Sequence, residues 1–383
     1  MAEALMGAVL LSISLLTAAA AATDVPWFYM YEGPEHDWLK NCSLTSEQDV
    51  AEYKVSQDGV SVHFLDAART HPHRATHSDD PRIKLYIIPA LIGLAARMHG
   101  CNGHTMDQML EITGAAVLKS PAYHKRKGQD HFVIAFDWLA EQHDYKGSFQ
   151  QLMKTVTVGG METWAHSPGF CRVALPYNAH YNAKSSSDTT KPLFDYFFMG
   201  GAAEDRIGYH TRIRGAKVLG ESDFNRAVVI TEHPGVEKLF PETCNFDKCI
   251  RRRQCGPCRA PFDSELYQNL LSQSRYSMVF HGDTPTSGRL YDAIGSGVVP
   301  LLVSQGLWRL GLPFSGTVSW PDMTVGLPHN YSWTDLWSIS NMPEHAYQLK
   351  VQAVKLHQQD LLWNHHDSRV FNNTLIHASK YCM

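Results

Sequence analysis

The sequence predicts an α/β protein with two Rossmann-like domains, and three observations support this fold class. Short apolar segments of strand length alternate with segments whose apolar residues recur at helical spacing. The alternation is interrupted by the polar, serine-rich stretch 178–191 and then resumes. In the second half, residues 276–303 are predicted to form a strand, a glycine-containing loop, a helix and a strand in succession. Repeated alternation of this kind implies parallel sheets with helices on both faces.

The first half carries the first set of alternating elements. Each predicted strand is a short apolar run, and Pro89 ends one of them because proline cannot donate a ladder hydrogen bond. The predicted strands are 27–31, 83–88 and 131–136, with short ones at 153–158 and 172–175, and the predicted helices are 60–69 and 106–118.

The second half repeats the scheme. Asp263 is predicted to cap a helix that ends at Ser274, because a short polar side chain at this position bonds the free N–H groups of the first turn. The predicted strands are 196–199, 226–231, 276–280, 298–303 and one at Val325, and the other predicted helices are 205–216 and 348–362.

Length and composition fit two globular domains. The chain has 383 residues, of which 44% are hydrophobic and 19% charged. The formal net charge of −4 provides no basic field for nucleic acid or for an anionic membrane. Most of the 21 histidines are expected to be uncharged at neutral pH.

The segment 276–303 is the most informative part of the chain. Thr284 is a suitable N-cap, Pro285 a suitable first helical residue, and Gly297 a suitable C′ residue. The free N–H groups at such a helix start favour an anion, and Arg289 adds a positive charge one turn later. Asp292 lies where a carboxylate can hold sugar hydroxyls. The alternative is an ordinary βαβ unit that binds nothing at this turn.

The N-terminus predicts entry into the secretory pathway. Residues 4–23 carry no charge and are apolar or small, so residues 1–22 are typical of a signal peptide. A single membrane anchor is the alternative, although the run is barely long enough to span a bilayer. Three glycosylation sequons fit a lumenal location, and they begin at Asn41, Asn330 and Asn372.

Four of the eight cysteines cluster in one short region. Cys244, Cys249, Cys255 and Cys258 are candidates for disulfides, because a lumenal compartment is oxidising. Zinc and free thiols are alternatives, and three pairings within the cluster stay open. The remaining cysteines, 42, 101, 171 and 382, are isolated in the sequence.

Several long segments resemble exostosin-type glycosyltransferases (glycosyltransferase family 47), and they follow one another in the family's order. The most specific is GDTPTSGRLYDAI followed by GVVPLLVS, which is similar to the family's donor-site segment. The others are WFYMYEGPEHDWL, HFLDAARTHPHRATHSDDPRIKLYIIPAL, GQDHFVIAFDW, FDYFFMGG with RIGYHTRIR, and LPFSGTVSWPDMTVGLP. Together the similar segments cover most of residues 25–345.

The resemblance implies a GT-B type protein with two Rossmann-like domains that face a central cleft. Residues 24–190 would form the acceptor-side domain and residues 191–345 the nucleotide-sugar-binding domain. The helix in residues 346–383 would pack back on the first half. The activity implied is transfer of a sugar, with inversion, from a nucleoside diphosphate sugar such as a UDP-sugar to a glycan acceptor in the Golgi lumen.

The leaving diphosphate needs positive charge, and the chain has no Asp-x-Asp pair to hold a metal. We therefore expect no metal and no cofactor, with helix N–H groups and arginines stabilising the leaving group. Between Arg212 and Arg214, the position in the family favours Arg214. The predicted donor-binding residues are Arg206, Arg214, Gly282, Asp283, Thr284, Thr286, Ser287, Arg289 and Asp292.

An inverting transfer also needs a base for the acceptor hydroxyl. Asp137 follows an apolar strand at its carboxyl end, where ligands of such sheets bind. His131 begins the same strand and is the second candidate. The alternatives are a helix cap for Asp137 and a buried, hydrogen-bonded group for His131. His281, Glu204 and Asp205 are further candidates.

The sequence departs from the family pattern at several positions. Gly288 replaces a frequent second arginine of the donor segment, and Phe136 replaces a frequent histidine. These differences keep open a catalytically inactive donor- or glycan-binding partner of another glycosyltransferase. A glycosidase is a weaker alternative, because no motif indicates its pair of carboxylates. The sequence leaves open the donor sugar, the acceptor, the linkage, and whether the chain acts alone.

Overall fold

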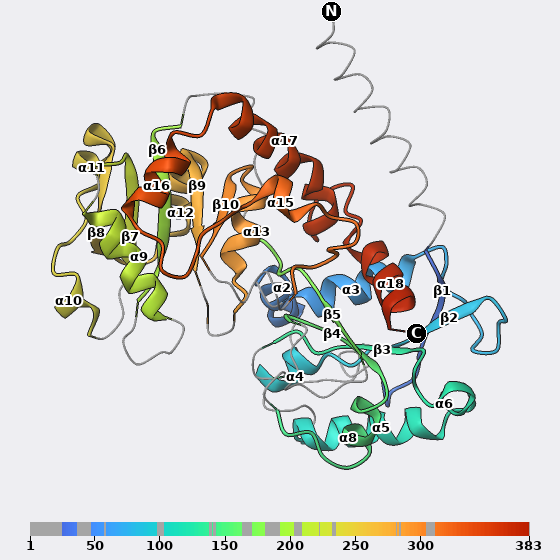
Figure 1. Ribbon diagram of the computed structural model, residues 1–383. Helices are drawn as coiled ribbons and strands as arrows, with labels where there is room; N and C mark the ends of the chain where they lie inside the picture. The colour runs from blue at the N-terminus through green and yellow to red at the C-terminus, as the bar shows by residue number, and fades with distance from the viewer. Residues whose placement is uncertain are drawn as a thin grey trace, which may run out of the picture.

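The structure is a computed structural model with two lobes, each built on a parallel β-sheet (Figure 1). The first sheet ends at Ala174 and the second begins at Phe194, so the chain forms the two Rossmann-like α/β units predicted from the sequence. The described residues are 25–36, 47–56, 59–97, 103–137, 140, 143–162, 171–180, 192–202, 209–221, 223–231, 235–280, 282, 285–303 and 311–382. Predicted features outside these residues are the leader 1–22, Asn41, Glu204, Asp205, Arg206, His281, Asp283 and Thr284.

The first lobe contains a five-stranded parallel sheet in the order β1-β2-β3-β4-β5. Neighbouring strands in the sheet are also neighbours in sequence. Its central strand, β3, is buried on both faces, as the continuous apolar run predicts. The strands are β1 (Trp27–Met30), β2 (Ile83–Ile88), β3 (His131–Ile134), β4 (Thr157–Gly160) and β5 (Cys171–Ala174).

The strand predicted at 153–158 begins later than expected. Met153 ends the helix α8 (Gly147–Met153), and β4 starts only at Thr157. Phe149, Leu152 and Met153 are all buried, which is helical spacing, so one apolar run contains the end of a helix and the start of a strand. The other helices of this lobe are α2 (Glu47–Val55), α3 (Val60–Thr70), α4 (Ile92–Arg97), α5 (Met106–Lys119) and α6 (Pro121–Arg126).

The second lobe contains a six-stranded parallel sheet in the order β11-β10-β9-β6-β7-β8. The strands are β6 (Phe194–Gly201), β7 (Arg226–Thr231), β8 (Gln254–Ala260), β9 (Ser274–Val279), β10 (Val299–Leu302) and β11 (Val325–Gly326). The helices are α9 (His210–Gly220), α10 (Val236–Leu239), α11 (Phe246–Arg252), α12 (Ser264–Ser272), α13 (Gly288–Gly295), α15 (Trp320–Met323) and α16 (Trp333–Ser340). Asp263 caps α12 as predicted, with its carboxylate accepting from the N–H of Leu266.

The edge strand β8 was not predicted from the sequence. Its seven residues, QCGPCRA, contain glycine and proline and lack a run of apolar residues. Two disulfides hold this edge, since Cys244 is joined to Cys258 and Cys249 to Cys255. The sulfurs of Cys244, Cys255 and Cys258 lie within 4.8 Å of one another, but the cross-links account for all three. The structure thus shows disulfides at the cluster and selects one pairing.

The last two helices return to the first lobe. Figure 1 shows α17 (Glu344–Leu361) running from the second lobe to α18 (Val370–Tyr381). α18 packs against α3, β2 and β5, and its apolar residues join the core of the first lobe. Cys382 at its end is joined to Cys171 of β5 by a disulfide, although both cysteines are isolated in the sequence. The two residues are 211 positions apart in sequence, and no local pattern relates them.

No helix in the described part of the chain combines the length and apolar character needed to cross a membrane.

Candidate active site between the lobes

The helix α13 begins at the carboxyl edge of the second sheet, after β9. Ser287 is its N-cap, and the Ser287 hydroxyl accepts a hydrogen bond from the N–H of Arg289 at 3.4 Å. The predicted start with Pro285 as first helical residue is therefore wrong, because the helix begins three residues later, at Gly288. At its end, Gly297 adopts a φ of 70°, the left-handed conformation expected of a C′ glycine.

Thr286, just before the helix, contacts the first lobe through Glu162. The Glu162 carboxylate follows the carboxyl end of β4 and accepts from the Thr286 N–H at 2.8 Å and from the Thr286 hydroxyl at 3.0 Å. Glu162 is 1% exposed and Thr286 is 3% exposed. The N-terminal end of α13 therefore faces the first lobe. The Glu162 carboxylate accepts the hydrogen bonds of Thr286, a residue that was predicted to bind the donor phosphate.

Two tyrosines, Tyr177 and Tyr291, lie beside the contact between Glu162 and Thr286. The Tyr177 hydroxyl lies 3.2 Å from the Thr286 hydroxyl and 2.8 Å from the sulfur of Met161. Tyr291, on α13, packs against Tyr177 with ring centroids 5.9 Å apart. Burial raises the pKa of Tyr291 well above its usual value, and the nearby Tyr177 and Glu162 raise it further. Burial therefore favours the neutral form of the Tyr291 hydroxyl.

Asp292 joins α13 to the segment between the sheets. Its carboxylate is fully buried and accepts from the backbone N–H of His180 at 3.0 Å and from the Tyr267 hydroxyl at 3.1 Å. Arg289 lies 3.5 Å away on the same helix. These contacts give Asp292 a structural role, whereas the predicted contact with donor hydroxyls stays a prediction.

Replacing Asp292 with alanine should destabilise the protein strongly. The change leaves the His180 N–H and the Tyr267 hydroxyl without their buried acceptor, and breaking a buried charged network costs about 3–5 kcal/mol. We expect a lower midpoint of thermal unfolding, followed by circular dichroism. Glu237→Ala, at an exposed position of α10, should shift the midpoint little, and an equal shift for both variants would contradict the role of Asp292.

Arg289 is the positively charged side chain in the first turn of α13. Its side chain is 27% exposed, and the guanidinium carbon lies 4.8 Å from the centre of the Tyr267 ring. Burial disfavours its charged form, but Tyr267 and Asp292 outweigh this effect and raise the pKa of Arg289. A permanent positive charge therefore stands in the first turn of α13.

Two arginines of α9 anchor different loops at the carboxyl edge of the same sheet. Arg214, the predicted donor ligand, donates to the carbonyls of His329 at 3.0 Å and Tyr331 at 3.1 Å. Arg212 donates to the carbonyl of Gly201, at the end of β6, at 3.1 Å. Both guanidinium groups lie near this edge, so Arg212 joins Arg214 as a candidate for binding the diphosphate.

The two predicted bases lie at opposite ends of β3. Asp137 follows its carboxyl end and is fully buried beside α4, where a Cβ added to Gly93 would come within 2.9 Å of the Asp137 Cβ. His131 begins the strand, and its ring bonds Tyr31 at 2.7 Å and Asp130 at 2.9 Å. His131 is fully buried at the amino end, away from the edge that meets α13. The position of His131 therefore favours the alternative role, that of a buried, hydrogen-bonded group, over that of a base.

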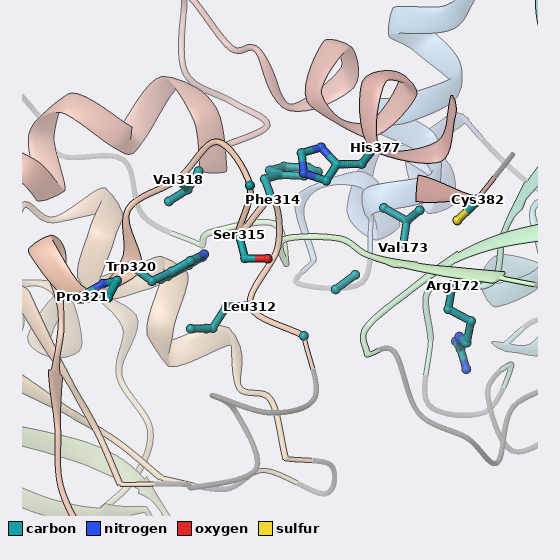
Figure 2. Close-up of a pocket in the computed structure, with 13 residues that line it drawn as sticks. Arg172, Val173, Leu312, Phe314, Ser315, Val318, Trp320, Pro321, His377 and Cys382 are labelled. Carbon is teal, nitrogen blue, oxygen red and sulfur yellow. The ribbon is translucent and has the colours of Figure 1, made fainter. Parts of the chain in front are cut away.

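A pocket of about 570 Å³ opens between β5 of the first lobe and residues 311–321 of the second (Figure 2). Figure 2 shows Phe314 and His377 beside each other on one side of it and Arg172 on the other. Most of the lining is apolar, and none of the predicted donor-binding residues contributes to it. Of the remaining donor-site candidates, Gly282 lies in the loop after β9 and makes none of the contacts described above.

The two described sequons differ in their surroundings. Asn330 is exposed in the turn before α16. Asn372 lies within α18, where its side-chain oxygen is 3.0 Å from His71 Nε2 and Thr374 of the sequon is fully buried. Glycosylation of both stays a prediction, with Asn330 the more accessible of the two.

Glu162 and Tyr177 were not singled out from the sequence. A signal for Glu162 was present, because it follows the glycines that end an apolar strand, and ligands of parallel sheets bind beyond the carboxyl ends of strands. The shifted assignment of β4 hid this signal. Tyr177 follows β5 in the segment toward the second lobe, and its contact with Thr286 depends on how the lobes meet.

Two parallel α/β sheets whose carboxyl edges meet define a two-lobed protein of GT-B type. The Exostosin GT47 domain model matches residues 28–340, and the chain belongs to this family.

Curated relatives match shorter stretches. The chain is 26% identical over 94 residues to "Probable glucuronoxylan glucuronosyltransferase IRX7" of Arabidopsis thaliana, covering 24% of this chain and 19% of the relative. It is 26% identical over 136 residues to Exostosin-1 of Drosophila melanogaster, covering 34% of this chain and 17% of the relative. The matches thus span less than a fifth of the length of either relative.

Among solved structures, the chain is similar to AviGT4, a glycosyltransferase involved in avilamycin A biosynthesis, with a TM-score of 0.39 and 11% identity. That match covers 84% of this chain and 88% of AviGT4. The chain is also similar to WaaG, a glycosyltransferase involved in lipopolysaccharide biosynthesis, with a TM-score of 0.38 and 10% identity. This match covers 84% of the present chain and 95% of WaaG.

Proposed function

We propose that the chain is an inverting glycosyltransferase that transfers a sugar from a nucleoside diphosphate sugar to a glycan acceptor without a metal. The observation that carries the proposal is the contact between Thr286, just before α13, and Glu162 of the first lobe. It is combined with membership of the exostosin GT47 family. Backbone N–H groups before α13 and the Arg289 guanidinium would stabilise the negative charge that grows on the leaving diphosphate. Arg214 and Arg212 are the second source of positive charge.

The first test is binding of a panel of UDP-sugars, followed as a rise in the thermal-unfolding midpoint of the purified chain. A ligand present at 100 times its Kd stabilises the folded state by about 2.7 kcal/mol. We expect the same rise with and without EDTA, because arginines and N–H groups replace a cation. A rise that vanishes with EDTA would contradict the metal-free scheme.

The second candidate is a catalytically inactive donor- or glycan-binding partner of another glycosyltransferase. This candidate is favoured by the two hydrogen bonds that the Thr286 N–H and hydroxyl donate to the Glu162 carboxylate, because these donors were predicted to bind the donor phosphate. Gly288, where the family segment often has arginine, points the same way. A chain that binds UDP but neither transfers nor hydrolyses any UDP-sugar would support this candidate.

We also propose that the chain works in the secretory pathway, in the Golgi lumen. The three disulfides of the described residues favour an oxidising compartment. Thiol labelling of the protein isolated from cells, before and after reduction, tests this location, because these cysteines should react only after reduction.

A further inference from the structure

Three aromatic rings form a row on the second lobe, and two of them are tryptophans of α16 (Figure 1). Trp333 is 46% exposed, and Trp337, one helical turn later, is 52% exposed. The Trp333 ring lies 5.9 Å from the Phe224 ring and 6.5 Å from the Trp337 ring, with interplanar angles of 21° and 25°. We call Phe224, Trp333 and Trp337 the aromatic row. Exposed aromatic surface of this kind marks a place where another group binds.

The aromatic row lies away from the candidate active site. All strands of the second sheet are parallel, so their amino ends share one edge. Phe224 directly precedes the amino end of β7, and Tyr196, near the amino end of β6, donates to the carbonyl of Leu336 within α16. α13 begins at the opposite, carboxyl edge. A sugar donor bound at α13 would therefore not cover the aromatic row.

A glycosylation sequon stands directly before the two tryptophans. Asn330 is exposed in the turn that precedes α16, and it begins the sequon with Tyr331 and Ser332. The guanidinium of Arg214 donates to the carbonyls on both sides of Asn330, those of His329 and Tyr331. These two hydrogen bonds hold the attachment point in place on the lobe.

The start of α16 fixes the distance between Asn330 and the aromatic row. Ser332 caps the helix, and its N–H donates to the Asp335 carboxylate at 2.7 Å. Trp333 is three positions after Asn330, so their α-carbons are at most about 11 Å apart. Trp337 lies about 6 Å further along the helix axis. The first sugars of a glycan attached at Asn330 are long enough to reach both rings.

From this placement we propose that the carbohydrate attached to Asn330 packs over the aromatic row and covers Trp333 and Trp337. The inference rests on the secretory-pathway location proposed above, because N-glycans are added to chains that enter that pathway. The face of an indole ring is negative and attracts the weakly positive C–H groups on one face of a sugar ring. The sugar hydroxyls stay in water, so this contact costs little desolvation.

Other occupants fit the surroundings of the aromatic row less well. The charged residue of α16 is the acidic Asp335, which gives no attraction to an anionic membrane. A protein partner would have to accommodate a bulky glycan at the edge of its interface. A free polysaccharide would compete with a glycan that is already tethered nearby, and a short tether raises the local concentration to the millimolar order.

The test uses the full chain secreted by a host that adds N-glycans, and compares it with Asn330→Gln. Peptide mass spectrometry first measures the glycan at Asn330. Hydroxyl radicals then oxidise exposed side chains, and the oxidation of Trp333 and Trp337 should at least double when the glycan is absent. Phe262 is the matched control and should not change, because it is 52% exposed but packs on Tyr267 in a different core cluster from α16.

Thermal unfolding provides an independent measure of the same contact. Loss of the glycan in Asn330→Gln should lower the midpoint by roughly 2–4 °C, the usual size for one contact of this kind. In the double variant Trp333→Ala, Trp337→Ala, the same loss should lower the midpoint much less, because the contact is already missing. Enzymatic release of the glycan from the folded wild type gives the same comparison, so the inference stays testable even where Asn330→Gln disturbs the turn.

Equal oxidation of Trp333 and Trp337 with and without the glycan would overturn this inference. A secreted chain that has its disulfides but no glycan at Asn330 would also overturn it, and both results would leave the proposed function and location standing. A chain whose cysteines react before reduction and whose Asn330 is unmodified would overturn the proposed location, and this inference with it.

Discussion

Replacing Arg289 with alanine is expected to lower sugar transfer by about 10²–10³-fold, the loss typical of removing one group that stabilises developing negative charge. The guanidinium stands in the first turn of α13, 4.8 Å from the centre of the Tyr267 ring and 3.5 Å from the Asp292 carboxylate. UDP affinity should also fall, by about 10- to 100-fold, since a hydrogen bond to a charged group contributes about 1.5–3 kcal/mol. Rates of UDP release at saturating UDP-sugar, together with UDP binding isotherms, measure both effects.

The Arg289 result has to be separated from damage to the Asp292 network. Asp292 keeps the His180 N–H and the Tyr267 hydroxyl when Arg289 is removed, so the variant should fold. Arg289→Lys retains the charge without the planar fork and should recover part of the activity. Arg251→Ala, at an exposed position of α11, is the matched control and should behave as the wild type. Unchanged transfer by a folded Arg289→Ala variant would show that the leaving charge is stabilised elsewhere.

The two-lobed α/β fold could be predicted from the sequence because its strands are buried on both faces. Such strands consist of continuous apolar runs, as in β3 and β10, and the helices between them repeat apolar residues at helical spacing. Local patterns of this kind depend on neighbouring residues alone. They therefore located most elements to within a few residues.

Features set by contacts between distant segments could not be predicted in this way. The start of α13 moved to Gly288 because Ser287 is extended and the preceding Thr286 is bonded to Glu162, which is 124 residues away from Thr286 in sequence. Strand β8 exists at the sheet edge with glycine and proline because disulfides and its pairing with β7 hold it there. In both cases tertiary contacts override the local preference.

Only the second-lobe side of the candidate site was predicted from the sequence. Pattern and resemblance located the α13 segment with Arg289 and Asp292, because a strand, loop and helix form a local unit. The first-lobe side of the site consists of the residues that face α13. Which residues these are depends on how the two sheets pack against each other. Glu162 and Tyr177 accordingly emerge only from the structure.

Removing the Cys171–Cys382 disulfide is expected to have the largest effect on stability. The cross-link joins β5 to the end of α18 across 211 residues, so it restricts a very large loop of the unfolded chain. The chain-entropy relation gives about 5 kcal/mol for a loop of this size. α18 covers α3, β2 and β5, and without the cross-link its end is held by packing alone.

The double variant Cys171→Ser, Cys382→Ser should therefore unfold at a midpoint lower by roughly 5–15 °C, measured by calorimetry. The matched control is Cys249→Ser, Cys255→Ser, which opens a cross-link between residues only 6 positions apart. The same relation gives about 2 kcal/mol for this small loop, so its midpoint should fall less. An equal or larger fall for the short loop would mean that native packing at β8, rather than restriction of the unfolded chain, controls the stability. A selective fall for the long loop would show that the C-terminal helix is covalently fastened to the lobe that supplies Glu162.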